Sequence, residues 1–273
     1  MATKGLPLQQ GPSTEVALFP TTPRVIYEEN PLEEVICQLK FPPILRIESP
    51  PPAEFQDSVR QDYPLLEENT PEQGMPAGLA KLLTDVPGFL TAKEFHFLSP
   101  DGSWNIGLTR EFIALSTKAY TRWEDFQKRL VAVIGSLVKL YEPSFFNRVG
   151  LRYRNVIVQS RLGLSGRSWT RLLKPHVLGE LSCEDVAPHI KQAARDIVIS
   201  LGDQGHVRIR HGLGKVKKTE ESGYIIDIDF YCERKVDVRE TIALLDYFHR
   251  QAGNLFRWCI TPELHDRLKP TAV

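Results

Sequence analysis

Two aspartates, two residues apart on a predicted strand, are the residues of this sequence best placed to do chemistry. Asp227 and Asp229 lie in the alternating segment 224–232, so their carboxylates share one face of the strand. Such a pair could hold a divalent metal ion or act as a general acid and base. A hairpin with the preceding strand would instead place Arg208 opposite Asp229 and Arg210 opposite Asp227, where each ion pair stabilises a sheet by roughly 0.2–1 kcal/mol. The sequence favours the ion pairs and leaves the metal or acid–base site as the alternative.

A glycine- and lysine-containing loop joins these two strands, over residues 211–218. Backbone amides freed by glycine, together with Lys215 and Lys217, could bind a phosphate group. The loop is not a Walker motif, because Lys215 is followed by Val216. It also lies between strands rather than before a helix, which removes the favourable helix dipole. We therefore predict a solvated hairpin tip, with nucleotide binding as the alternative.

Three arginines share one face of the strand predicted over residues 147–158. Arg148, Arg152 and Arg154 alternate with apolar residues, and Tyr153 points to the opposite face, where it cannot stack with them. This arginine face is a candidate contact surface for an acidic protein or for nucleic acid, and its binding would weaken steeply with salt. We expect a protein partner and regard nucleic acid as the less supported alternative.

Overall composition excludes several classes of protein. Lysine plus arginine and aspartate plus glutamate both number 34, and a pI near 7.1 argues against a general polyanion binder. The four cysteines are scattered, as is typical of free thiols in a reducing cytoplasm. Apolar runs are too short for a membrane span, and we expect no signal peptide, no membrane contact and a cytoplasmic location. The histidines show no zinc-binding spacing, so no cofactor is expected, and His249 is predicted to be solvated on the polar side of its helix.

Two long amphipathic helices must position these groups. A helix beginning after Thr121 has apolar residues at a spacing of three and four, and Glu124 completes a predicted capping box. A second helix has Asp237 and Glu240 at the same spacing and runs to about Trp258. Each helix follows a predicted hairpin and a third strand. A helix laid across an antiparallel sheet buries the apolar face of both, which is the α+β arrangement.

The repeated order predicts an α+β fold of two related antiparallel units that arose by internal duplication. We place a disordered tail at residues 1–24, a first unit at 25–160 and a second unit at 161–273, as two lobes or one continuous domain. The strand at residues 35–41 is bounded by prolines and is expected at a sheet edge, where a protein partner could add a strand. The proline-rich segment 42–52 beside it is the second candidate surface.

Several passages resemble a sporadically distributed bacterial family whose members have no established activity. The resemblance covers residues 25–268 and is carried by NPLEEVICQLKFPP at 30–43, NRVGLRYRN at 147–155, and the segments 223–229 and 260–264. It implies no catalytic residues. Sporadic distribution often accompanies mobile or defence genes, which implies an accessory role in an antiviral or stress-response system. We therefore predict a non-enzymatic binding or adaptor protein, with a nucleotide- or metal-dependent enzyme, or a nucleic-acid-binding protein, as the alternative.

Overall fold

The computed structural model describes residues 18–69, 93–215 and 221–273, and it confirms the α+β fold class. The described strands form a nine-stranded antiparallel sheet in the order β3-β4-β5-β6-β2-β7-β10-β9-β8, and a small sheet of β1 and β11. The strands are β1 (Val25–Tyr27), β2 (Leu32–Lys40), β3 (Leu65–Asn69), β4 (Glu94–Leu98), β5 (Trp104–Leu108), β6 (Phe112–Thr117), β7 (Arg148–Val158), β8 (Arg195–Ser200), β9 (His206–Lys215), β10 (Ser222–Cys232) and β11 (Pro270–Ala272).

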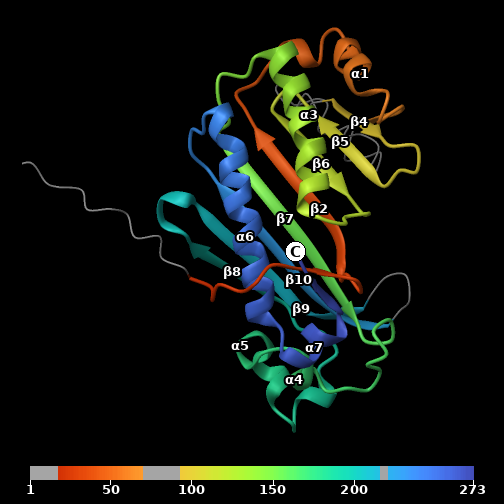
Figure 1. Ribbon diagram of the computed structural model, residues 1–273, viewed down its shortest axis with the longest axis vertical. Helices are drawn as coiled ribbons and strands as arrows, with labels where there is room; N and C mark the ends of the chain where they lie inside the picture. The colour runs from red at the N-terminus through yellow and green to blue at the C-terminus, as the bar shows by residue number, and fades with distance from the viewer. Residues whose placement is uncertain (1–17, 70–92, 216–220) are drawn as a thin grey trace, which may run out of the picture.

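Two long helices, α3 (Trp123–Tyr141) and α6 (Thr241–Cys259), lie across one face of the large sheet (Figure 1). Their apolar stripes and the inward residues of the strands form one continuous core. None of the helices in the described part of the chain is long and apolar enough to cross a membrane. The shorter helices are α1 (Ala53–Val59), α4 (Trp169–Leu172), α5 (Pro175–Leu178) and α7 (Pro262–Arg267), with 3₁₀ turns η1 (Leu45–Ile47), η3 (Gly179–Ser182), η4 (Ala187–His189), η5 (Gly202–Gln204) and η6 (Val238–Glu240).

The two halves of the chain build the large sheet with the same topology, except for one added strand. In the first half, the chain runs β2, β3, β4, β5, β6 and α3, and the strands lie in the order β2-β6-β5-β4-β3, with β3 as the added strand at the edge. In the second half, it runs β7, β8, β9, β10 and α6, and the order is β7-β10-β9-β8. The halves meet where β2 pairs with β7, so they share one sheet. This is a likeness of topology, and common descent of the halves stays a prediction.

The expected edge strand lies instead at the middle of the sheet. β2 pairs with β6 on one side and with β7 on the other, so the prediction that residues 35–41 form an edge is wrong. Val35, Cys37 and Leu39 are fully buried against the helices. The prolines that follow the strand end it after residue 40, and they do not protect a free edge.

The predicted capping box of α3 is also wrong. The N-cap residue is Arg122, and no side chain caps the helix. The carboxylate of Glu124 is bound by the guanidinium groups of Arg24 and Arg122. In the second helix, the carboxylate of Asp237 accepts a hydrogen bond from the backbone N–H of Arg239, which caps η6, and α6 follows directly.

The described end of the predicted tail is ordered against the helices. Phe19 is only 3% exposed and packs on Trp258, with ring centroids 5.7 Å apart. Thr22 donates its backbone N–H to Asn254 of α6, and Arg24 forms an ion pair with Glu124 of α3. We call residues 18–27 the N-terminal strap. The prediction of a tail up to residue 24 is corrected for this segment, and residues 1–17 lie outside the described part of the chain.

Candidate functional site

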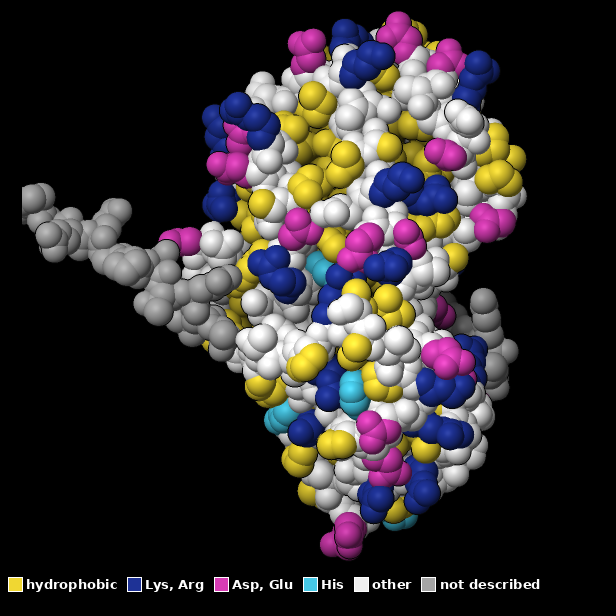
Figure 2. Space-filling view, in the orientation of Figure 1, with side chains coloured by type: hydrophobic (Ala, Val, Ile, Leu, Met, Phe, Trp, Pro, Cys, Tyr) yellow, Lys and Arg dark blue, Asp and Glu magenta, His cyan; other side chains and the backbone are white. Residues whose placement is uncertain are grey.

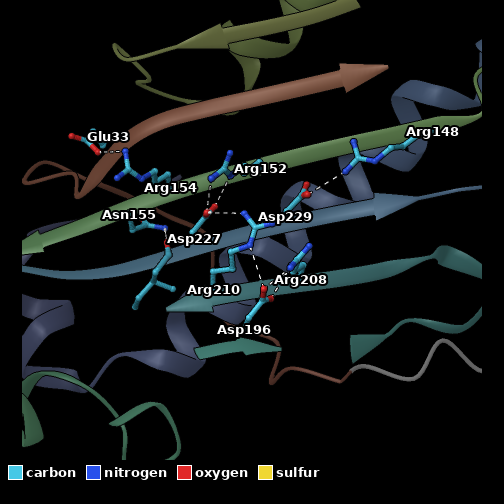
Figure 3. A network of polar contacts seen from close by, with 11 residues as sticks. Glu33, Arg148, Arg152, Arg154, Asn155, Asp196, Arg208, Arg210, Asp227 and Asp229 are labelled. Atoms are coloured by element: carbon cyan, nitrogen blue, oxygen red, sulfur yellow. Dashed lines mark hydrogen bonds and ion pairs between the residues drawn. The ribbon is translucent and has the colours of Figure 1, made fainter. Parts of the chain in front are cut away.

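The sequence-predicted arginines and aspartates come together on the face of the sheet that is not covered by α3 and α6. We call this group the charged sheet face, and Figure 3 shows its ion pairs. Its arginines come from β7 and β9 and its carboxylates from β2, β8 and β10: Glu33, Arg148, Arg152, Arg154, Asp196, Arg208, Arg210, Asp227 and Asp229.

Asp227 lies at the centre of the charged sheet face. Arg152 holds it in a two-point contact, with Nε 2.7 Å from Oδ1 and Nη2 2.5 Å from Oδ2. Arg210 lies directly opposite Asp227 in the register, as predicted, but at 3.9 Å its guanidinium makes the weaker contact. Asp227 is 7% exposed, so the surrounding arginine side chains exclude most water from its carboxylate.

Asp229 has a different environment on the same strand. Its Oδ2 accepts a hydrogen bond of 3.2 Å from Arg148, which also binds Gln38 of β2. Burial raises the pKa of Asp229, and the nearby charge of Arg148 only partly opposes that shift. Arg208 lies opposite Asp229 in the register, as predicted, but its guanidinium binds Asp196 of β8.

The principal partners of the two aspartates are therefore on β7, which corrects the expectation that they pair with β9. Long arginine side chains lean along the strand, so a residue can pair with a diagonal neighbour rather than with the residue opposite. Arg152 is opposite Asp229 in the register and yet binds Asp227. The sequence gives the register but not the direction in which each side chain leans.

Each arginine of the charged sheet face has a carboxylate partner. Besides the pairs above, Arg154 Nη1 lies 2.6 Å from Glu33. Within the described residues, no three histidine, cysteine or acidic side chains are grouped so that they could hold a metal ion. The five arginines of the face share its four carboxylates, and its aspartates are occupied by guanidinium groups.

The glycine- and lysine-containing loop is described only in part. β9 ends at Lys215, which is the last residue before a gap at 216–220. Lys217 therefore lies outside the described residues. Lys215 is not one of the residues labelled in Figure 3.

A second candidate site lies on the opposite face of β7, and sequence reasoning did not find it. It is a cavity of about 280 Å³ between the N-terminal strap, the start of α3, α6 and the inward face of β7. Several aromatic rings line it, and we call it the aromatic pocket. The aromatic residues that line it are Tyr27, Tyr120, Trp123, Tyr153 and Phe256. Figure 2 shows this side of the molecule, where hydrophobic side chains gather over α3.

His249 lines the aromatic pocket, so the prediction that it is solvated is wrong. Its ring stacks on Trp123, with centroids 4.7 Å apart and planes 8° from parallel. Its Nδ1 lies 2.9 Å from the hydroxyl of Tyr153. Burial, and then the charge of Arg24, lower the pKa of His249 to about 4. The imidazole is therefore neutral near pH 7.

Arg257, about two helical turns further along α6, also lines the pocket. Its Nη1 is buried and has no hydrogen-bond partner among the described residues. Its positive charge opposes the rise in the pKa of Tyr27 that burial causes, and it helps to lower the pKa of His265. No aspartate or glutamate is among the described residues that line the pocket.

The sequence carries little signal for this pocket because its walls come from distant segments. Tyr27, Trp123, Tyr153 and His249 each read locally as ordinary residues of a helix or strand. The pairing of β1 with β11 and the contact of α6 with the start of α3 bring them together, and neither is visible as a motif.

No protein-family model matches the sequence, and a comparison with curated proteins found no match.

Proposed function

We propose that the chain is a non-enzymatic binding protein that contacts a protein partner, as an accessory or regulatory component of a bacterial antiviral defence system. The defence role rests on the family resemblance of the sequence. The contact rests on one observation of the structure. β8 ends the described sheet, and its outer edge carries exposed apolar side chains.

The sequence of β8 is unusual for a strand at an edge. Ile197 and Val198 are 42% and 54% exposed, and Ile199 follows them directly. Natural edge strands avoid pairing through proline, bulges or charged side chains, and three consecutive β-branched apolar residues favour pairing instead. In the described part of the chain, only β9 pairs with β8. We therefore infer a protein partner that adds an extended strand to β8 through backbone hydrogen bonds.

The charged sheet face supports this proposal over nucleic-acid binding. A protein that binds a polyanion presents cations that are free to neutralise phosphates. Here, Arg152 and Arg154 are already paired with Asp227 and Glu33. In the proposed complex, these arginines contribute only where the partner brings acidic groups to the rim.

The test is capture of a partner from the native host, followed by binding measurements with variants of both surfaces. Val198→Lys places a charge on edge strand β8, opposite Arg208 on the charged sheet face, and is expected to weaken binding at least tenfold. Val131→Lys, at a similarly exposed valine of α3, is the matched control and should bind normally. The double variant Arg152→Glu/Arg154→Glu measures how much electrostatic contacts of these arginines contribute to the binding free energy. Equal binding by both valine variants, or capture of mainly nucleic acid, contradicts the proposal.

The alternative enzyme is tested with the same preparations. A metal site at Asp227 and Asp229 would give Mg²⁺- or Mn²⁺-dependent thermal stabilisation that both Asp→Asn variants lose. The proposal predicts no such stabilisation, because Arg152 and Arg148 bind these carboxylates.

A further inference from the structure

The guanidinium of Arg257 in the lining of the aromatic pocket is a candidate binding group for an anion. The guanidinium of Arg257 has a buried nitrogen, Nη1, without a hydrogen-bond partner among the described residues. Removing water from a charged group costs several kcal/mol unless a partner compensates. None of the described ion pairs gives Arg257 a carboxylate, whereas Arg24 and Arg122 at the rim share Glu124. Arg257 shares a hydrogen bond with the hydroxyl of Tyr27, so the unmet group is the single nitrogen Nη1, which an anionic ligand could bind.

The rest of the pocket suits a flat apolar body rather than a bare ion. Tyr27, Tyr120 and Phe256 contribute ring surface, and His249 adds a neutral ring stacked on Trp123. Pockets that bind small molecules are mostly apolar, with a few polar groups that fix the orientation of the ligand. A cavity of about 280 Å³ has room for a ligand of one or two rings.

The N-terminal strap forms the cover of this cavity. Residues 21–27 line it, and they are held at one end by Arg24 and Glu124, with two guanidinium–carboxylate contacts of 2.5 and 2.9 Å. At the other end, β1 pairs with β11. The Arg24–Glu124 pair is half-exposed and can break at little cost, so a ligand can enter beside the strap without unfolding the core.

We propose that the aromatic pocket binds a small organic anion, a carboxylate or phosphate ester with a planar aromatic body, through its negative group on Arg257. The fork of guanidinium donors matches the two oxygens of either group. The aromatic body lies against Tyr120, Tyr153 and Phe256 in place of water. This site is on the opposite face of β7 from the charged sheet face, and it does not depend on the protein partner proposed above.

The test is isothermal titration of the full chain with four probes: naphthalene-2-carboxylate, the uncharged naphthalene-2-methanol, adenosine 5′-monophosphate and inorganic phosphate. We expect at least one aromatic anion to bind with a Kd below about 1 mM, tenfold or more tighter than the uncharged alcohol and inorganic phosphate. A preference for the carboxylate or for the monophosphate identifies the class of negative group.

Matched variants tie the binding to the pocket. Arg257→Gln should weaken binding of the aromatic anion tenfold or more, whereas Arg60→Gln, at an exposed arginine outside the lining of the pocket, should not. Gly253→Leu adds a side chain at the lining of the pocket, where no atom lies within 4 Å of the new Cβ, and should block binding. Gly135→Leu, at an equally open glycine of α3, is its control.

Thermal melting of each variant shows that it is folded. Three results would overturn the proposal: no aromatic anion binds below about 1 mM, inorganic phosphate binds as tightly as the aromatic anions, or Arg257→Gln and Gly253→Leu bind like their controls.

Discussion

The two faces of β7 carry charge in opposite ways. On one face, Arg152 is held at two points by Asp227, and its neighbours on the sheet are paired in the same manner. On the other face, Tyr153 and His249 form the wall of a pocket in which Arg257 has a buried nitrogen without a described partner. The charged sheet face is dense in charge, and its charges are paired. The lining of the aromatic pocket has four arginines and no carboxylate, and Nη1 of Arg257 has no hydrogen-bond partner among the described residues. A cation with an unpaired buried nitrogen favours ligand binding, whereas a network of paired charges does not.

The largest effect should come from breaking the satisfied face at its centre. Asp227→Ala leaves Arg152 and Arg210 without their buried partner, and we expect the free energy of unfolding to fall by about 3 kcal/mol. Glu33→Ala, which removes the exposed partner of Arg154, is the control and should cost less than about 1 kcal/mol. Urea unfolding near pH 7 measures both. Equal losses would mean that Asp227 is not the centre of the network.

The pocket face should respond to acid through His249. The pKa of His249 is about 4 in the folded protein, below the ordinary value of 6.5. Between these values the unfolded chain binds a proton that the folded chain does not, so stability falls as the pH drops from about 6.5 to 4. After allowance for partial exposure, we expect a loss of about 2 kcal/mol. Urea unfolding at pH 6.5 and pH 4 should show a smaller fall in the free energy of unfolding for His249→Gln than for the parent protein. An equal fall in both proteins would contradict the burial of this ring.

The contrast between the faces explains what the sequence could predict. Alternation in residues 147–158 places Arg152 and Tyr153 on opposite faces, and the hairpin register between β9 and β10 is confirmed residue by residue. The faces of these residues and the register both depend on local periodicity, because a shift of one residue would expose the apolar side chains of the strand. The α+β class follows from the same periodicity, read on strands and helices in turn.

Features that depend on contacts between distant segments were missed. The part of the strap up to residue 24 was predicted to be disordered because its own residues show no pattern, but Phe19 is buried by Trp258, 239 positions later. His249 appeared solvated because its neighbours on the helix are polar, and it is Trp123 of the other long helix that covers it. The position of β2 was misjudged because prolines next to a strand do not show whether the strand has one neighbour or two.

Asp229 sharpens the comparison within the charged face itself. Its pKa is raised by burial, so the fold favours its protonated form and loses stability as the pH rises above about 3.8. Near pH 7, Asp229→Asn should change the free energy of unfolding by less than about 1 kcal/mol, with a gain as the favoured direction, because it removes a poorly compensated charge. Urea unfolding from pH 4 to 7 should show that the free energy of unfolding falls less with rising pH in the variant than in the parent protein. A destabilisation as large as that of Asp227→Ala would show that both carboxylates are equally well compensated.

The smallest effect concerns one exposed ion pair from each side of the sheet. Arg24–Glu124 fastens the strap over the pocket, and Arg154–Glu33 lies at the rim of the charged sheet face. The side chains of both pairs are 37–45% exposed, so water and salt screen both to a similar degree. Double-mutant cycles with Arg24→Gln/Glu124→Gln and Arg154→Gln/Glu33→Gln should each give a coupling of about 0.5 kcal/mol that is lost near 1 M NaCl.

The two ion pairs should contribute equally to stability but differ in function. Breaking the Arg24–Glu124 pair should speed entry of an aromatic anion into the pocket, measured by stopped-flow fluorescence. Breaking the Arg154–Glu33 pair should leave that rate unchanged. Equal entry rates for both variants would show that the strap does not cover the way into the pocket.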